Sequence, residues 1–139
     1  MNRTLILFVP ILTCALVESA YALGPSEVFE KVSPSVWTVR SLDETERSVA
    51  FGSGVVIGPG RMVTNCHVIK EARFIVVRRE HAIYEAKREY SDRRHDLCTL
   101  KIADFNAPAA AVAPLSGVRV GQRVFAIGAP AGYFIRPGL

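Results

Sequence analysis

His67 ends a stretch of chain that is suited to hold an imidazole in place. The stretch begins with Phe51 and a Gly-Ser-Gly triplet, continues as a β-branched run over residues 55–57, and ends with a short strand over residues 62–64. Between them, Gly-Pro-Gly predicts a hairpin turn, because glycine permits positive φ and proline fixes φ. A free imidazole exchanges its proton near neutral pH. His67 is therefore a candidate general base.

A carboxylate, Asp96, stands at the start of a second short motif further along the chain. The residues that follow it alternate, with positions 97, 99 and 101 on one face and positions 98, 100 and 102 on the other, which predicts a strand. A carboxylate that accepts a hydrogen bond from Nδ1–H of a histidine selects its tautomer and stabilises the imidazolium. Two strands of one barrel, opening toward the same cleft, would bring His67 and Asp96 together.

Four motifs, taken in order, resemble the trypsin-like serine proteases and in particular their bacterial HtrA/Deg branch. They are Gly-Ser-Gly-Val-Val-Ile, Val-Thr-Asn-Cys-His-Val, His-Asp-Leu-Cys-Thr-Leu and Val-Gly-Gln-Arg-Val-Phe-Ala-Ile-Gly-Ala-Pro-Ala-Gly, within residues 28–132. The resemblance implies an all-β fold, a six-stranded antiparallel Greek-key barrel followed by the start of a second barrel. It implies His67 as the general base and Asp96 as its orienting acid in the hydrolysis of protein or peptide substrates.

The serine nucleophile that the resemblance implies is missing from these 139 residues. In that family it sits in a Gly-Asn-Ser-Gly-Gly-like loop of the second barrel, and no such loop occurs here. Ser53 matches the strand before the base, and Ser116 matches a connecting segment. Neither has the strained turn and paired backbone N–H groups that acyl transfer requires. The chain is therefore expected to be inactive by itself.

Three interpretations of the function follow. The chain is the front half of a trypsin-like serine endopeptidase, shortened in the gene or in the sequence. Alternatively, it is a non-catalytic, protease-like module for binding or regulation, or a half-enzyme completed by a partner that supplies the second barrel. An isolated half would expose the apolar surface that the second barrel covers, which is an aggregation hazard. This favours the first interpretation for ancestry, and the third over the second for a stable product.

Cys66 and Cys98 stand close in sequence to the candidate base and acid. An exported protein meets an oxidising compartment, so the pair is a disulfide candidate if His67 and Asp96 meet in the fold. Two buried free thiols are the alternative. A zinc site of Cys66, His67, His95 and Cys98 is disfavoured, because adjacent residues of a strand point to opposite faces. These residues predict neither a metal site nor a cofactor.

Residues 1–22 are predicted to be a secretory signal peptide. Asn2-Arg3 precedes an apolar run over residues 5–17, and Ala20-Tyr21-Ala22 supplies a cleavage site after Ala22. The apolar run is shorter than the ~20 residues that a membrane span needs, so no stable span is expected. The mature protein is predicted to be periplasmic or secreted.

The composition fits one domain with a substantial core, because 50% of the 139 residues are hydrophobic and 22% are charged. The formal net charge is +4 at pH 7. Basic residues fall in pairs, such as those at 78–79, 87–88 and 93–94, and acidic residues lie between the pairs. A nucleic-acid binder would instead gather them on one surface beside aromatic side chains, so nucleic acid is not an expected partner.

Local patterns predict the remaining elements. Residues 25–32 predict a short entry helix with Pro25 at its start. Strands are expected over residues 36–40, 49–57, 62–64, 73–78, 83–90 and 96–103, with a helical turn at 68–70. Gly52 and Gly54 indicate a bulge or a close backbone approach. The domains are therefore a barrel over residues 23–105, an Ala/Pro-rich linker over 106–119, and a truncated second barrel over 120–139 that starts with a strand at 123–127.

Overall fold

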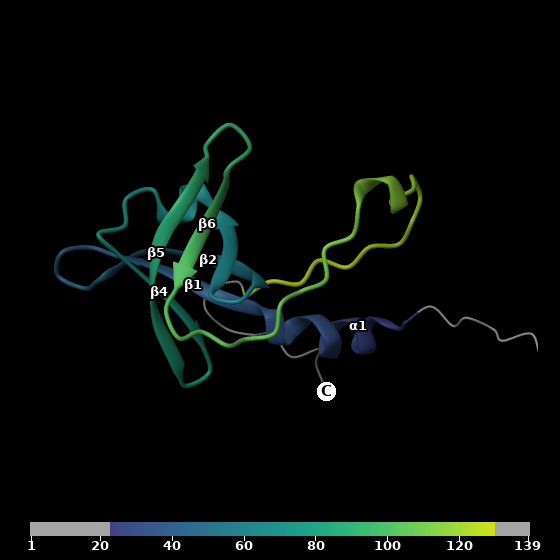
Figure 1. Cartoon of the computed structure of the whole chain (residues 1–139), viewed down its shortest axis with the longest axis horizontal. Coiled ribbons are helices and arrows are strands. Elements are labelled where there is room, and N and C mark those ends of the chain that lie inside the picture. Colours follow the sequence, from purple (N-terminus) through teal and green to yellow (C-terminus); the bar gives the residue numbers. More distant parts are fainter. Residues whose placement is uncertain (1–22, 130–139) are drawn as a thin grey trace, which may run out of the picture.

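The computed structural model describes residues 23–129, which form a six-stranded barrel preceded by a short helix (Figure 1). Helix α1 (Pro25–Val32) has the expected bounds; Pro25 occupies its first turn, and the Glu27 carboxylate accepts a hydrogen bond from the Gly24 N–H at 2.7 Å. The elements that follow are η1 (Ser33–Ser35), β1 (Val36–Leu42), β2 (Ser48–Gly58), β3 (Arg61–Asn65), η2 (Cys66–Ile69), β4 (Phe74–Arg79), β5 (Ala82–Asp92), β6 (Leu97–Ile102) and η3 (Leu115–Gly117). The predicted signal peptide lies outside the described residues.

The six strands close into one barrel in the order β1-β2-β3-β6-β5-β4, and every pairing is antiparallel. Two pairings join strands that are not consecutive, β3 with β6 and β1 with β4. In the first of these, Thr64 is the partner of Cys98 and Asn65 is the partner of Leu97. The end of β3 therefore lies beside the start of β6, which is the contact that builds the candidate site.

The core fills the interior of the barrel with side chains that alternate along the strands. On β6, Cys98, Leu100 and Ile102 are buried, while the residues between them are more exposed, as the alternation predicts. Three aromatic rings, those of Trp37, Tyr84 and Phe105, pack edge to face with centroids 4.9 to 5.8 Å apart. Phe105 follows β6 directly, so it joins the chain beyond the last strand to the core.

Gly52 and Gly54 of β2 mark close approaches rather than bulges. A Cβ at Gly52 would lie 2.6 Å from Cγ2 of Val68, in the turn that carries His67. The register of β2 shifts elsewhere, near each of its ends. Gly52 therefore lets η2 pack directly on the barrel wall, which is one of the two alternatives that the sequence left open.

Gly54 offers a direct test of this packing. A Cβ there would lie 2.8 Å from Cγ2 of Val39 and would also clash with the Met62 side chain, whereas a Cβ at Gly58 would meet nothing within 4 Å. Because overpacking a filled core is destabilising, we expect Gly54→Ala to lower the free energy of unfolding by about 1–3 kcal/mol. Urea unfolding followed by circular dichroism measures the change. Gly58→Ala is the matched control, and an equal loss in both variants would contradict the packing argument.

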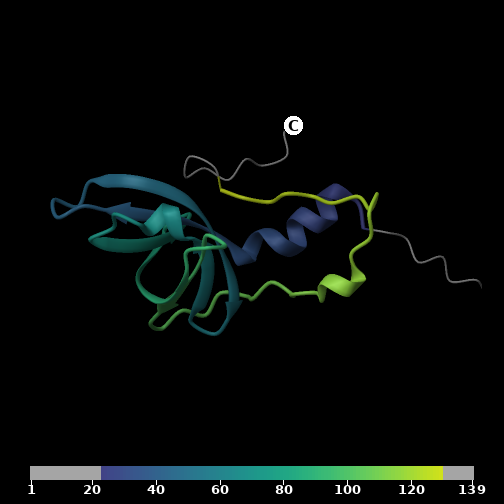
Figure 2. The same cartoon turned by 90° about the horizontal axis from the view of Figure 1, so that it is seen from above.

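The chain beyond β6, over residues 103–129, makes an excursion: it leaves the barrel, turns at η3 and runs back toward the barrel (Figure 2). Both limbs of this excursion are tied to β2: the Ala110 N–H donates to the Val56 carbonyl at 2.9 Å, and the Ala129 N–H donates to the Ser53 hydroxyl at 2.8 Å. The predicted linker over residues 106–119 contains no strand in the structure.

The expected strand over residues 123–127 is not formed in the described part of the chain. Within residues 23–129, this segment has no neighbouring strand to supply ladder hydrogen bonds, and an isolated strand is not stable in water. The predicted start of a second barrel is therefore not seen and stays a prediction. Among residues 23–129, no helix combines the length and the apolar character that crossing a bilayer requires.

Candidate active site

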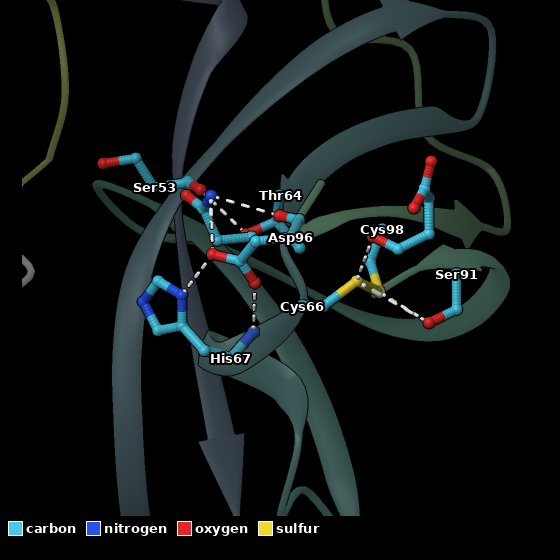
Figure 3. Close-up of polar contacts among 9 residues, drawn as sticks. Ser53, Thr64, Cys66, His67, Ser91, Asp96 and Cys98 are labelled. Atoms are coloured by element: carbon cyan, nitrogen blue, oxygen red, sulfur yellow. Dashed lines mark hydrogen bonds and ion pairs between the residues drawn. A yellow bond between two sulfur atoms is a disulfide. The ribbon is translucent and has the colours of Figure 1, made fainter. Parts of the chain in front are cut away.

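His67 and Asp96 meet at the rim of the barrel, where β3 ends and β6 begins (Figure 3). Nδ1 of His67 lies 2.5 Å from Oδ2 of Asp96, and the backbone N–H of His67 donates to Oδ1 of the same carboxylate at 2.8 Å. One carboxylate thus holds both the ring and the backbone of the histidine. The side chains remain 70% and 41% exposed, respectively.

Three consecutive residues hold Asp96 in place. The Cys66 N–H donates to the Asp96 carbonyl at 3.1 Å, and the Asn65 side-chain amide donates at 3.2 Å to both the carbonyl and Oδ2 of Asp96. Asp96 has a φ of 54°, in the left-handed region that few residues other than glycine adopt. Aspartate tolerates this conformation better than most residues. The chain can therefore turn into β6 while the carboxylate faces His67.

The turn that carries His67 is η2, which differs from the expected strand end. Its carbonyl groups are bound from two other strands: the Ser41 hydroxyl donates to the Val68 carbonyl at 2.6 Å, and the Arg88 guanidinium donates to the Ile69 carbonyl at 2.6 Å. Ser41 is fully buried. These bonds satisfy carbonyl groups that a short 3₁₀ turn leaves without partners.

A disulfide joins Cys66 to Cys98, with the two Cα atoms 5.0 Å apart. It links η2 to β6 immediately beside the contact between His67 and Asp96. The Ser91 hydroxyl lies 3.2 Å from Sγ of Cys98 and 3.6 Å from Sγ of Cys66. Because the two sulfur atoms are bonded to each other, neither cysteine is a free thiol in this structure.

The zinc alternative does not fit this arrangement. Cys66 and Cys98 are oxidised, and a metal ligand must be a thiolate. Nδ1 of His95 lies 2.8 Å from Oδ2 of Asp92, so His95 has a different neighbour. Cys66 and His67 lie in the turn η2 and not in a strand, so the expectation that they occupy opposite faces of a strand was wrong. Across residues 23–129, no group of three or more metal-binding side chains is arranged to hold an ion.

The two candidate serines take no part in this contact. The Ser53 hydroxyl accepts the Ala129 N–H at 2.8 Å and is directed away from the imidazole of His67 (Figure 3). Ser116 lies in η3, on the excursion that leaves the barrel. The structure thus brings His67, Asp96 and the two cysteines together and leaves both serines apart.

The residues that support the base and the acid were not predicted from the sequence. Asn65 binds Asp96, and Ser41 and Arg88 hold the turn of His67. A hydroxyl at an inward position of β1 was the available signal for Ser41, because buried polar groups normally have partners. Arg88 is one of the paired basic residues and had no distinguishing signal in the sequence.

A cleft of about 190 Å³ opens beside the imidazole. Its lining combines the disulfide, the His67 and Asp96 pair, and four further polar or basic side chains: Lys70, Arg88, Ser91 and Arg93. The imidazole thus borders a space that could hold part of a bound molecule.

The pKa of Asp96 lies below its ordinary value of 3.8, first because its side chain is hydrogen-bonded to His67 and then because it accepts the His67 backbone N–H. A carboxyl with a depressed pKa stabilises the folded state above its unfolded pKa, and this contribution is lost as the pH falls through the folded pKa. We therefore expect wild type to exceed Asp96→Asn in stability at neutral pH, with a difference that shrinks below about pH 3.8.

Urea unfolding at a series of pH values measures this difference between wild type and Asp96→Asn. Asp43 and Asp92 also have depressed pKa values, but they are present in both proteins and cancel in the comparison. Asp104→Asn is the control for the loss of a charge, since the Asp104 carboxylate accepts no hydrogen bond within residues 23–129. A difference that grows toward acid pH would contradict the depressed pKa of Asp96.

Comparison with known proteins gives a consistent result at three levels. The family model of the trypsin-like peptidase domain matches residues 52–136. A Pseudomonas putida protein described as a "Probable periplasmic serine endoprotease DegP-like" is 32% identical over 109 residues, which are 77% of this chain and 23% of that protein. A Rickettsia conorii protein with the same description is 36% identical over 97 residues, covering 68% and 19% of the two chains.

Solved structures of proteases share the fold of this chain. The serine endoprotease from Yersinia pestis has a TM-score of 0.53 at 35% identity, covering 58% of this chain and 30% of that one. The Rv3671c protease in its inactive form has a TM-score of 0.55 at 30% identity, covering 63% and 42%. The chain spans about a quarter of the length of the Pseudomonas putida relative.

Proposed function

The chain belongs to the trypsin-like peptidase domain family, in its HtrA/Deg-like branch, and from this we propose that it carries the general base and the orienting acid of a serine endopeptidase. His67 is the proposed base and Asp96 the proposed acid. The observation that carries the proposal is the 2.5 Å contact between Nδ1 of His67 and Oδ2 of Asp96. Family membership makes protein substrates the expected substrate class.

The proposed mechanism follows from the two ring nitrogens. Asp96 accepts the Nδ1–H of His67, so the neutral ring presents a lone pair at Nε2, which has no partner within residues 23–129. Nε2 then takes the proton of a serine hydroxyl as its oxygen attacks the scissile carbonyl, and later gives that proton to the leaving amine. Asp96 stays ionised throughout and stabilises the imidazolium.

The serine and the oxyanion donors belong, in this proposal, to a second barrel that packs on the exposed rim. The exposure of the base and the acid supports this, because electrostatic stabilisation of a transition state is stronger where water is excluded. Val118, Val120 and Val124 are exposed on the excursion beyond β6 and are available to pack against such a barrel. The second barrel follows in the same polypeptide or comes from a partner.

We also propose that the protein works in the periplasm. The relatives from Pseudomonas putida and Rickettsia conorii carry a periplasmic description. The expected signal peptide, with cleavage after Ala22, would export the chain, and the disulfide suits an oxidising compartment. N-terminal sequencing of the protein isolated from a periplasmic fraction tests this, with Leu23 as the expected first residue.

A chimera tests the catalytic proposal. Residues 23–129 replace the matching segment of the Pseudomonas putida DegP-like relative, which then supplies the serine and the oxyanion loop. We expect the chimera to cleave casein and to react with a fluorophosphonate probe, whereas residues 23–139 alone should not be labelled. A folded chimera that cleaves nothing would count against the proposed function. Labelling of residues 23–139 alone would overturn the claim that the nucleophile lies elsewhere.

A further inference from the structure

The cleft beside His67 carries a concentration of positive charge. Lys70, Arg88 and Arg93 line it and come from three separate segments: Lys70 follows η2, Arg88 lies in β5, and Arg93 lies in the turn between β5 and β6. The fold therefore gathers on one cleft three cations that are scattered in the sequence.

These cations are not neutralised by nearby carboxylates. Lys70 and Arg93 form no ion pair within residues 23–129, and Arg88 donates only to the Ile69 carbonyl. By contrast, Arg61, on another part of the barrel, is held by Glu89 through two hydrogen bonds of 2.9 and 3.1 Å. Lys70 and Arg93 are thus available to a ligand.

Asp96, the carboxylate that lines the cleft, and Asp92, which precedes Arg93, are already engaged in hydrogen bonds. Asp96 accepts hydrogen bonds from His67 and Asn65, while Asp92 accepts them from the backbone of Arg94 and from His95. They are therefore less able to compete for Lys70 and Arg93. The cleft therefore carries uncompensated positive charge, which favours the binding of an anion.

The rest of the lining limits the size and kind of the anion. The disulfide provides an apolar wall, and the exposed hydroxyl of Ser91, which lies 3.2 Å from Sγ of Cys98, adds a polar group. The cleft has a volume of about 190 Å³, which leaves room for a short side chain. A carboxylate on an aliphatic stem matches both features.

We propose that this cleft binds the carboxylate of an aspartate or glutamate side chain of the protein substrate, and that Lys70 and Arg93 thereby determine specificity. The inference rests on the proposed function, since His67 and Asp96 line the same cleft and any occupant lies against the peptide being cleaved. Arg88 has a different main role, because its guanidinium supports the turn of His67.

Binding of three fluorescein-labelled peptides to the full chain tests the proposal by fluorescence anisotropy. The first has one central glutamate and an amidated C-terminus, the second has glutamine in its place, and the third has glutamine and a free C-terminal carboxylate. Low ionic strength is used because salt screens exposed charges. We expect the glutamate peptide to bind several-fold more tightly than both glutamine peptides, since each exposed ion pair contributes a factor of about two to five.

Matched substitutions separate the cleft from the overall charge of the protein. Lys70→Gln and Arg93→Gln should each reduce the preference for glutamate by about two- to fivefold. Lys87→Gln and Arg94→Gln, which remove the same charges from exposed positions outside the cleft lining, should leave it unchanged. Equal loss in all four variants would show an effect of net charge and would overturn the proposal.

Two other outcomes would also overturn it. One is equal binding, or no binding, of the glutamate peptide and its amidated glutamine counterpart. The other is a preference for the free C-terminus alone, which would mean that the cleft recognises chain ends.

The chimera distinguishes the proposed specificity from the proposed peptidase function. If an active chimera cleaves glutamate and glutamine substrates with equal kcat/KM, the proposed specificity is wrong and the proposed peptidase function is retained. If the chimera folds but is inactive, and the full chain of this protein still prefers the glutamate peptide, the proposed peptidase function is wrong and a carboxylate-binding site is retained.

Discussion

Replacing His67 with alanine in the chimera is expected to lower kcat for casein by about 10⁴- to 10⁶-fold, because no other group can take the serine proton as the bond forms. KM should change far less, since the imidazole contributes little to ground-state binding. Steady-state kinetics with fluorescein-labelled casein, together with circular dichroism to confirm folding, measures both quantities.

His95→Ala is the matched control for this experiment. His95 is 68% exposed and paired with Asp92, as His67 is 70% exposed and paired with Asp96, and the two histidines lie on neighbouring turns. We expect His95→Ala to keep nearly full activity. Equal inactivation by both substitutions, or full activity without His67, would contradict the assignment of the base.

Breaking the bond between Cys66 and Cys98 is expected to have the largest effect on stability. The disulfide closes a loop with a sequence separation of 32, and the chain-entropy relation gives about 3–4 kcal/mol for a loop of that size. A loss of this size is a large share of the stability of a single small domain. We therefore expect reduction to shift the urea midpoint strongly toward lower concentrations.

Urea unfolding of wild type with and without a thiol reductant measures this loss, with the double variant Cys66→Ala/Cys98→Ala as the internal control. The variant should be as unstable as the reduced wild type, apart from the cavity that truncating a buried Cys98 leaves, and the reductant should not change it further. A wild-type midpoint that is insensitive to the reductant would mean that the disulfide contributes no stability.

Most of the barrel could be predicted from the sequence, because each strand carries its own signal. Alternation of apolar and polar residues predicted β6, and proline with an early glutamate predicted α1, whose bounds were confirmed. The strand over residues 123–127 was predicted from the same kind of local signal and did not form. A strand needs a neighbour for its hydrogen bonds, and local pattern says nothing about the presence of that neighbour.

The candidate site, like the barrel, could be predicted only in part from the sequence. The motifs around His67 and Asp96 named both residues, but the supporting contacts of Asn65 and Ser41 could not be predicted from sequence. The Ser41 contact depends on how the turn η2 packs across β1, and the Asn65 contact depends on how the end of β3 lies beside the turn before β6. Both involve residues far apart in the chain. No local periodicity reports such a contact.

The sequence by itself determined which side chains are available for chemistry and which segments are able to form strands, because both properties depend on single residues and short repeating patterns. Only the tertiary structure decided that the end of β3 lies beside the start of β6, so that imidazole, carboxylate and disulfide meet at one rim. It also decided that Lys70 and Arg93 face one cleft. The physical reason is that barrel closure fixes the register between distant strands, and that register alone sets the distances between their ends.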